Sequence, residues 1–266
     1  MSAGVARPFY LLVLSLCSCF ASCADEGKEP VLAIPKASPV KVPVFNSQEV
    51  PSSARSREAV ARIAPSLIRQ LQSRNLSYGS SVFIRIFKSE RELELWVKGD
   101  GGYELFRTYA VAAMSGQLGP KLREGDRQAP EGFYYIPPSR MNPNSRFHLS
   151  MNLGYPNRYD RVHERTGSAL MVHGGIASIG CFAMTDPKIE EIYAMTEAAL
   201  RNGQSFFRVH CFPFRMSEAN MKKHVQPKWH SFWVNLKEGY DFFESSKLPP
   251  DVRVEDGKYL FGKTTN

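Results

Sequence analysis

The sequence contains few cysteines, and most of them lie at one end. Its 266 residues include only five, and three of these, Cys17, Cys19 and Cys23, fall within the first 24 residues. The remaining two, Cys181 and Cys211, are too few and too far apart for a disulfide-stapled secreted scaffold. They can still pair with each other, or one of them can act as a reactive thiol.

Long hydrophobic runs and internal repeats are also missing. No apolar run reaches the ~20 residues of a membrane-spanning helix, which excludes a polytopic membrane protein. A basic run interleaved with aromatic residues is absent as well, which argues against nucleic acid as a partner. What is present is an ordinary globular composition, 43% hydrophobic and 23% charged, with a formal net charge of +8. This excess of positive charge favours an anionic partner such as phospholipid headgroups or an acidic polymer.

The N-terminus has the pattern of an export signal, because residues 9–20 are apolar or small and small residues follow at 21–24. Two processing routes are consistent with it. Ser22 and Ala24 can serve an ordinary cleavage before Asp25, or residues 20–23 can act as a lipobox that makes Cys23 a lipid anchor in a membrane. We therefore expect residues 1–24 to be a signal peptide, either of the ordinary or of the lipoprotein type. We expect the protein to lie in the periplasm or cell envelope.

The chain then divides into segments of different character. Residues 25–54 carry prolines at 30, 35, 39, 43 and 51, which predicts an extended linker. Residues 55–78 have apolar residues at helical spacing, which predicts an amphipathic helix with a kink at Pro65. We expect one folded domain over 79–215, a helical extension over 216–245 and a polar tail over 246–266.

The domain over 79–215 is predicted to be mostly strands. Alternating and β-branched runs indicate strands at 82–87, 93–97, 103–114, 133–136, 147–153, 168–172 and 204–212. One helix is predicted from Asp186 as N-cap, through Pro187 at its first position, to a stop at Asn202-Gly203. The expected fold class is mixed α+β, mostly β, with flanking helices.

A possible reactive pair lies in the segment 170–186. A strand ends at His173, Gly174 and Gly175 form a tight turn, and a loop of small residues returns to Gly180-Cys181. A thiol nucleophile needs a base or cation near sulfur, because the thiolate is the reactive form, and it needs N–H groups free to bind an oxyanion. Spacing alone leaves structural roles for both residues open. These two residues supply only two zinc ligands and no Cys-x-x-Cys lies nearby, so no metal site is predicted.

This segment resembles the active-site signature of the L,D-transpeptidase (YkuD-type) catalytic domain family, in which a His-Gly strand end precedes a Ser-x-Gly-Cys loop. Stretches at 84–88, 115–121, 128–134, 142–145, 152–157 and 209–216 are similar to its YafK-like branch. The resemblance covers about residues 55–245. It implies a YkuD-type β-sandwich or barrel-like catalytic domain.

The resemblance also implies the roles of four residues. Cys181 would attack a peptide carbonyl attached to diaminopimelate and form a thioester. His173 would hold the thiolate and move the proton, and the backbone carbonyl of Gly174 would orient the histidine. Gly180 and Cys181 would shape the oxyanion hole. No cofactor is implied.

Five further residues are candidates for the substrate site. Arginine binds carboxylates in a bidentate manner, so Arg158, Arg161 or Arg165 would contact the carboxylates of peptidoglycan stem peptides, with a solvated basic loop as the alternative. Tyr155 would line the pocket or pack in the core. Ser178 belongs to the active-site loop and is predicted to contact substrate.

The implied reaction is hydrolysis. Members of the YafK-like branch resemble an amidase that cuts the diaminopimelate–lysine bond between peptidoglycan and an outer-membrane lipoprotein. Ile179 stands where many family members have His, and Ala183 where many have Arg, which argues against plain cross-linking. The alternatives are an L,D-transpeptidase that forms cross-links or attaches protein, and a non-catalytic module that binds the cell wall through its basic surface.

Overall fold

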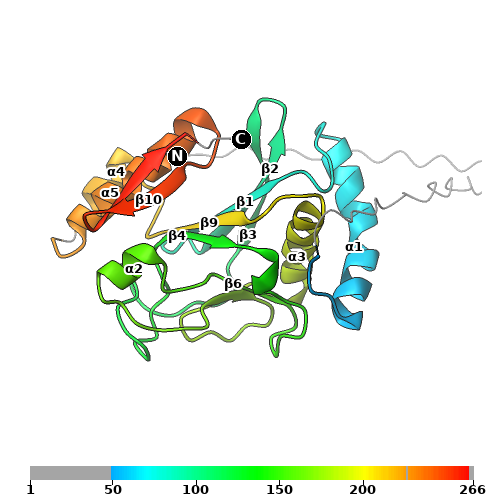
Figure 1. Ribbon diagram of the computed structural model, residues 1–266, viewed down its shortest axis with the longest axis horizontal. Coiled ribbons are helices and arrows are strands. Elements are labelled where there is room, and N and C mark those ends of the chain that lie inside the picture. The colour runs from blue at the N-terminus through cyan, green and yellow to red at the C-terminus, as the bar shows by residue number, and fades with distance from the viewer. Residues whose placement is uncertain (1–48, 226, 264–266) are drawn as a thin grey trace, which may run out of the picture. The chain divides into compact units, whose positions relative to one another are not determined.

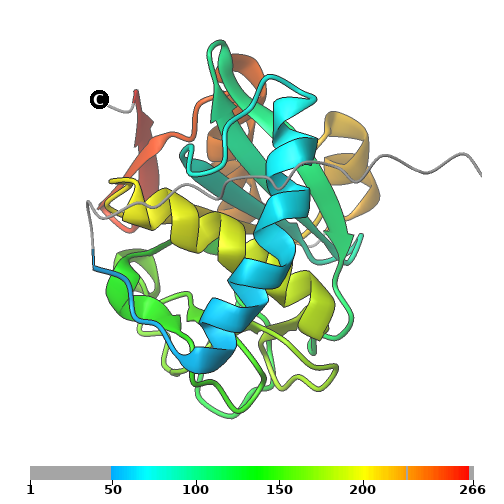
Figure 2. The ribbon, with the colours of Figure 1, turned by 90° about the vertical axis from the view of Figure 1, so that its right-hand side faces the viewer.

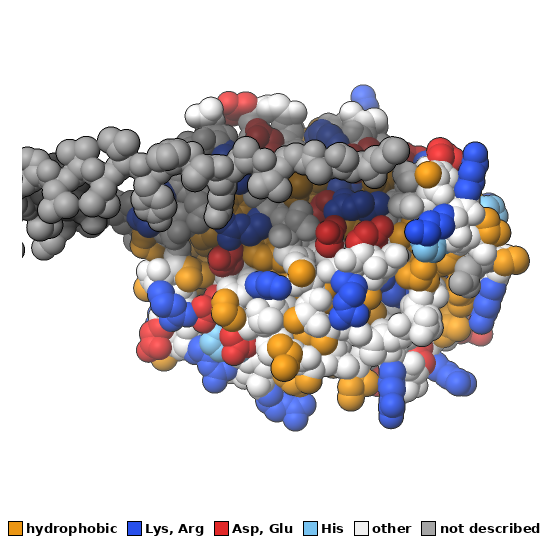
Figure 3. All heavy atoms as spheres, turned by 180° about the vertical axis from the view of Figure 1, so that it is seen from behind, with side chains coloured by type: hydrophobic (Ala, Val, Ile, Leu, Met, Phe, Trp, Pro, Cys, Tyr) orange, Lys and Arg blue, Asp and Glu red, His pale blue; other side chains and the backbone are white. Residues whose placement is uncertain are grey.

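The computed structural model describes residues 49–225 and 227–263, all within one compact unit. The predicted signal peptide, Cys23 and the predicted linker up to residue 48 lie outside the described residues. No helix in the described ranges combines the length and the apolar composition needed to cross a bilayer. Lys and Arg side chains are spread over the face shown in Figure 3, with Asp and Glu among them.

A five-stranded sheet forms the centre of the fold (Figure 1). Its order is β3 (Gly102–Ala110), β2 (Glu92–Gly99), β1 (Val82–Phe87), β9 (Phe207–Phe212) and β4 (Gly132–Ile136). Every residue of β1 is buried, as expected for a central strand without hydrophobic alternation. β1 and β2 form the predicted antiparallel hairpin, whereas β1 and β9 are parallel.

A second, four-stranded sheet carries the segment of interest. Its order is β5 (Met141–Asn142), β6 (Ser150–Asn152), β7 (Met171–His173) and β8 (Phe182–Ala183). Both sheets are open, so the mixed α/β architecture agrees with the predicted class without a closed barrel. The strands predicted at 103–114, 147–153, 168–172 and 204–212 differ from β3, β6, β7 and β9 mainly at their ends.

Two helices cover one side of these sheets. Helix α3 (Asp186–Arg201) contacts β1, β6 and β7, and α1 (Ala54–Gln72) lies across α3 (Figure 2). Leu67 and Leu71 of α1 are fully buried in this contact region. Pro65 lies inside α1, and the helix continues past it to Gln72.

The N-cap of α3 is Thr185, one residue before the predicted Asp186. Thr185 has φ +75° and its side chain makes no capping hydrogen bond. Asp186 is instead the first helical residue, and its carboxylate accepts a hydrogen bond from the Gly175 backbone N–H at 2.7 Å. The Asp186 side chain therefore makes a tertiary hydrogen bond instead of the predicted N-cap hydrogen bond.

The C-terminal part differs most from expectation. The predicted helical extension forms α4 (Glu218–Lys223) and α5 (His230–Ser246), whereas the short helix α2 (Arg158–Val162) lies earlier, between β6 and β7. The predicted polar tail forms a hairpin of β10 (Asp251–Glu255) and β11 (Lys258–Gly262). Asp256 and Gly257 both have positive φ, as a two-residue hairpin turn of this hand requires. The hairpin packs on α5 and buries Tyr259, which is 1% exposed. The prediction missed the Asp-Gly turn signal between two short apolar runs.

Candidate active site

The register of β7 and β8 brings the two predicted reactive residues together. These strands are parallel, with Val172 opposite Phe182 and His173 opposite Ala183. Cys181 directly precedes β8, so this register places it next to the end of β7 that carries His173. If the alternation of side chains along a strand continues by one residue, the thiol projects on the same face as the imidazole.

His173 is held in one orientation by a short contact to the backbone. Its ring is 1% exposed and packs against Phe147 with ring centroids 4.5 Å apart. Nδ1 lies 2.6 Å from the carbonyl oxygen of Gly174. A carbonyl can only accept, so Nδ1 carries the hydrogen and Nε2 has the free lone pair. Gly174 thus has the geometry predicted for the orienting carbonyl.

The surroundings keep His173 neutral. Burial lowers the pKa of its imidazole below the ordinary 6.5, and the hydrogen bond to the Gly174 carbonyl opposes this only in part. A neutral ring with a free Nε2 is the form that can accept a proton. The lowered pKa is therefore consistent with the predicted role of His173 as the group that moves the proton.

Cys181 is half-buried and is a thiol at rest. Its Sγ lies 3.6 Å from the carbonyl oxygen of Ala169. Burial raises the pKa of the thiol, opposed by a backbone hydrogen bond from Met171 and by the positive charge of Lys121. If Cys181 acts as the predicted nucleophile, its thiol must lose the proton during attack, and His173 is the predicted acceptor.

Gly180 shapes the loop before the nucleophile but does not offer its own amide to an oxyanion. Its N–H donates to Ser115 Oγ at 2.7 Å. It adopts φ +95°, and a Cβ at this position would lie 3.1 Å from the Gln128 carbonyl oxygen. Of the two residues predicted to shape the oxyanion hole, Gly180 therefore acts through its backbone conformation, and the N–H of Cys181 stays a predicted donor.

The loop is closed on itself by Ser178. The Ser178 hydroxyl donates to the carbonyl oxygen of Cys181 at 2.6 Å, across three residues. This bond fixes the turn around Gly180. The structure thus gives Ser178 a role in holding the nucleophile loop, and its predicted contact with substrate stays a prediction.

Of the other substrate candidates, Arg165 lies in the interior, which contradicts its prediction. It forms an ion pair with buried Asp160 at 2.9 Å, and its guanidinium lies over the rings of Tyr159 and Phe232. A buried pair of this kind leaves no charge free for a ligand, so Arg165 stabilises α2. Arg161, by contrast, is exposed and donates to a backbone carbonyl of Pro156.

Tyr155 packs in the core, the second of its two predicted roles, and Arg158 lies at the surface. Tyr155 is 5% exposed, and its hydroxyl donates to the Lys121 carbonyl oxygen at 3.1 Å, so it supports the loop over 115–128 from below. Arg158 is exposed at the start of α2 and lines a different cavity, described below. Neither is shown to contact the thiol.

Three residues that the sequence did not single out take part in this site. Lys121 supplies positive charge near the thiol, and its Nζ is 2.5 Å from Asp126 Oδ1. Ser115 holds the Gly180 amide, and Asp186 holds the Gly175 amide. The motif over 115–121 was the available signal for Ser115 and Lys121, but its contact with the Cys181 loop joins residues 65 apart in the chain.

Comparisons with known proteins identify the family of the chain. The domain described as the L,D-transpeptidase catalytic domain, YkuD, matches residues 81–211. Over 185 residues the chain is 46% identical to YafK of Escherichia coli (strain K12), which its name places among the L,D-transpeptidases only provisionally. That match covers 70% of this chain and 75% of YafK, and YafK of Escherichia coli O157:H7 gives the same values.

Two solved structures show a more distant likeness. A mutant of the helical cell shape determining protein Pgp2 from Campylobacter jejuni has a TM-score of 0.43 and 18% identity, over 71% of this chain and 63% of that chain. Bd1075 of Bdellovibrio bacteriovorus has a TM-score of 0.37 and 18% identity, over 62% and 56%. The chain thus spans less than two thirds of either structure. On the matched domain and the identity with YafK, this chain belongs to the YkuD family of L,D-transpeptidase catalytic domains.

Proposed function

We propose that this protein is an amidase of the cell envelope that hydrolyses the diaminopimelate–lysine bond joining a lipoprotein to peptidoglycan. Membership of the YkuD family makes it a peptidoglycan-related cysteine enzyme. The bond and the acceptor are our proposal, supported by the similarity to the YafK-like branch. We also propose that the protein acts in the periplasm, attached to a membrane if Cys23 carries lipid.

The observation that carries the proposal is the orientation of His173 beside Cys181. With Nδ1 bound to the Gly174 carbonyl, Nε2 accepts the thiol proton as Sγ attacks the diaminopimelate carbonyl carbon. The resulting oxyanion is stabilised by backbone N–H groups, among which we predict that of Cys181. Collapse breaks the C–N bond, and His173 returns its proton to the departing lysine amine.

A second half-reaction frees the enzyme. His173 takes a proton from water, and the hydroxide attacks the thioester carbonyl carbon. The C–S bond then breaks, giving a diaminopimelate carboxylic acid, and the sulfur recovers its proton from His173. The loop beside the nucleophile is open to solvent, since Ile176 and Ile179 are 74% and 73% exposed, which supports water as the acceptor.

The test is mass spectrometry of lipoprotein-loaded peptidoglycan incubated with residues 25–266. The expected product is soluble lipoprotein ending in free lysine. Cys181→Ala should abolish it, whereas Cys211→Ala should retain it because Cys211 is fully buried in the core.

Three other results would contradict the proposal in distinct ways. Retained release by Cys181→Ala would exclude the thioester mechanism. New diaminopimelate cross-links or exchanged amino acids would make the protein a transpeptidase. Tight binding to peptidoglycan by both proteins without any product would make it a cell-wall-binding module.

A further inference from the structure

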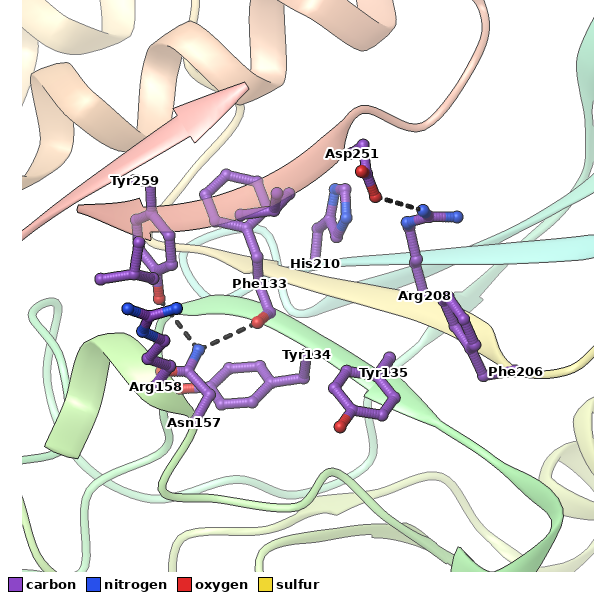
Figure 4. A pocket seen from close by; sticks show the side chains of 12 residues that line it. Phe133, Tyr134, Tyr135, Asn157, Arg158, Phe206, Arg208, His210, Asp251 and Tyr259 are labelled. Carbon is purple, nitrogen blue, oxygen red and sulfur yellow. Dashed lines mark hydrogen bonds and ion pairs between the residues drawn. The ribbon is translucent and has the colours of Figure 1, made fainter. Parts of the chain in front are cut away.

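A cavity lies away from the nucleophile, between β4, β9, the start of α2 and β10 (Figure 4). Its volume is about 240 Å³, below the ~300–1,000 Å³ of typical small-molecule pockets, so it suits a single ring. None of its lining residues belongs to the segments 115–128 or 170–186. Its walls are aromatic: Phe133, Tyr134, Tyr135, Phe206 and Tyr259.

One face of the cavity presents aromatic surface to solvent. Tyr135 is 49% exposed, and its ring meets that of Phe206 edge-on with centroids 5.3 Å apart. The face of an aromatic ring is electron-rich and attracts C–H groups that carry partial positive charge. The C–H groups on one side of a sugar ring meet this requirement. The Arg140 guanidinium lies over the Tyr135 ring, 4.9 Å from its centroid, so a sugar would pack on the opposite face of the ring.

Two arginines lie at opposite ends of the cavity, and they differ in their partners. Arg208 forms an ion pair with Asp251 at 3.1 Å. Arg158 lies beside Tyr259 in Figure 4, and no carboxylate among the described residues pairs with it. Because guanidinium binds carboxylate in a bidentate manner, Arg158 is available for an acidic ligand.

The third feature is a buried nitrogen that lacks a partner. His210 lines the cavity, is 1% exposed and lies between the rings of Phe83 and Phe133, each with its centroid 4.7 Å away. Its Nδ1 makes no hydrogen bond within the described part of the chain. Buried polar nitrogens are almost always hydrogen-bonded, so this one calls for an additional group. A hydroxyl can exchange a hydrogen bond with a neutral imidazole.

We propose that this cavity binds one sugar ring that carries a short acidic peptide, as found on the glycan strand of peptidoglycan. The ring packs on Tyr135 and Phe206, a hydroxyl reaches His210, and a peptide carboxylate pairs with Arg158. An aliphatic chain would leave His210 and Arg158 unpaired, and a free phosphate would not use the aromatic walls. The naming of peptidoglycan as the source rests on the proposed function, and the site would hold the polymer while Cys181 acts elsewhere on it.

The probe is N-acetylmuramyl-L-alanyl-D-glutamate, which has the sugar and carboxylates but no diaminopimelate. Binding is measured by calorimetry and by NMR shift changes, with full-length mature protein and its Cys181→Ala variant. We expect saturable binding that Arg158→Gln weakens by ~10-fold or more, because a charged hydrogen bond is lost. Arg161→Gln is the matched control on the same helix and should bind as the parent does.

Amidating both carboxylates of the probe should weaken its binding as much as Arg158→Gln does. Tyr135→Ala should weaken the binding of both the free-acid probe and the amidated probe. The proposal is overturned if no saturable binding occurs, if Arg158→Gln and Arg161→Gln bind equally, or if the amidated probe binds as well. Release of lipoprotein from peptidoglycan is assayed separately. Loss of that activity with intact Arg158-dependent binding would refute only the amidase proposal, and the converse would refute only this cavity.

Discussion

Burial changes the proton affinities of the two reacting side chains in opposite directions. It lowers the pKa of His173 below 6.5 and raises the pKa of the Cys181 thiol above 9.0. Between these values both groups are neutral, so the resting enzyme is a thiol beside an imidazole rather than a thiolate–imidazolium pair. Proton transfer to Nε2 is then part of the chemical step.

This resting state predicts the pH dependence of the reaction. Protonated His173 cannot act as a base, so kcat/KM should rise as the pH increases through a pKa below 6.5 and stay high to at least pH 8. The profile is measured from pH 4.5 to 9 on the isolated substrate. An optimum near pH 5 with activity falling between pH 6 and 8 would contradict the neutral pair.

Gly180 is the residue whose backbone the site depends on most directly. Gly180→Ala should cost about 1–2 kcal/mol of folding stability because of its left-handed φ, and should also displace the Gln128 carbonyl. Gly125, in the loop over 115–128, also has a positive φ of +76° but open space around its Cα. Gly125→Ala therefore carries the same backbone strain without the contact.

The expected result is a loss of stability in both variants, at least as large in Gly180→Ala because of the added contact, and a loss of activity, ~10-fold or more, only in Gly180→Ala. Urea unfolding and kcat on the lipoprotein-linked substrate measure the two effects. Equal activity in both variants would show that the Gly180–Gln128 contact does not position the nucleophile.

Among the secondary-structure elements, the contact between the His173 strand end and α3 is the one that the chemistry uses. A Cβ on Gly174 would lie 2.5 Å from Asp186 Oδ1, so only glycine allows the two segments to approach this closely. The Gly174 N–H donates to the carbonyl oxygens of Phe147 and Leu149, which ties the same residue to the segment just before β6. The carbonyl that orients His173 is thus held from two sides.

Asp186→Ala should loosen this arrangement. Loss of the bond from Gly175 leaves that amide without its partner and should lower kcat by ~10-fold with little change in KM, because the residue acts on His173 and not on substrate. Asp186→Asn keeps an acceptor oxygen and should restore most of the activity. Equal losses in the two variants would mean that the charge of Asp186, rather than its hydrogen bond, matters.

At the scale of the whole molecule, a buried ion pair joins the loop over 115–131, which contacts the Cys181 loop, to the central sheet. Lys88, at the end of β1, lies 2.9 Å from Glu131 Oε1 and also donates to the carbonyl oxygens of Gly119 and Ala129. Glu131 in turn accepts from the Gly119 N–H and from Trp233 of α5. Both side chains are essentially inaccessible to water.

Removing one partner leaves an unpaired charge in the interior. Lys88→Met should therefore lower the free energy of unfolding by about 3–5 kcal/mol, measured by urea denaturation. Lys98→Met, on the exposed part of β2, should change it by less than about 0.5 kcal/mol. A loss below about 1 kcal/mol for Lys88→Met would show that the pair is not part of the stabilising network.

Local patterns were enough to predict much of this protein. Alternating and β-branched runs predict the strands that became β1, β2 and β4, and helical spacing predicts α1 and α3, because both patterns depend only on near neighbours in the chain. The His-Gly end and the Gly-Cys loop likewise stand close together in the sequence. They could be recognised as a reactive pair before any tertiary contact was known.

Contacts between distant residues decided the remainder. Whether an arginine meets solvent or a buried carboxylate depends on what packs over it, so Arg165 and Arg158 could not be told apart from sequence, although only one is free. The Gly180 N–H donates a hydrogen bond to Ser115, and the Asp186 carboxylate accepts one from Gly175 instead of capping its helix. No local sequence pattern indicates either partner. The cavity around His210 exists only because the C-terminal hairpin closes over the edge of the sheet, which a reading of near neighbours cannot foresee.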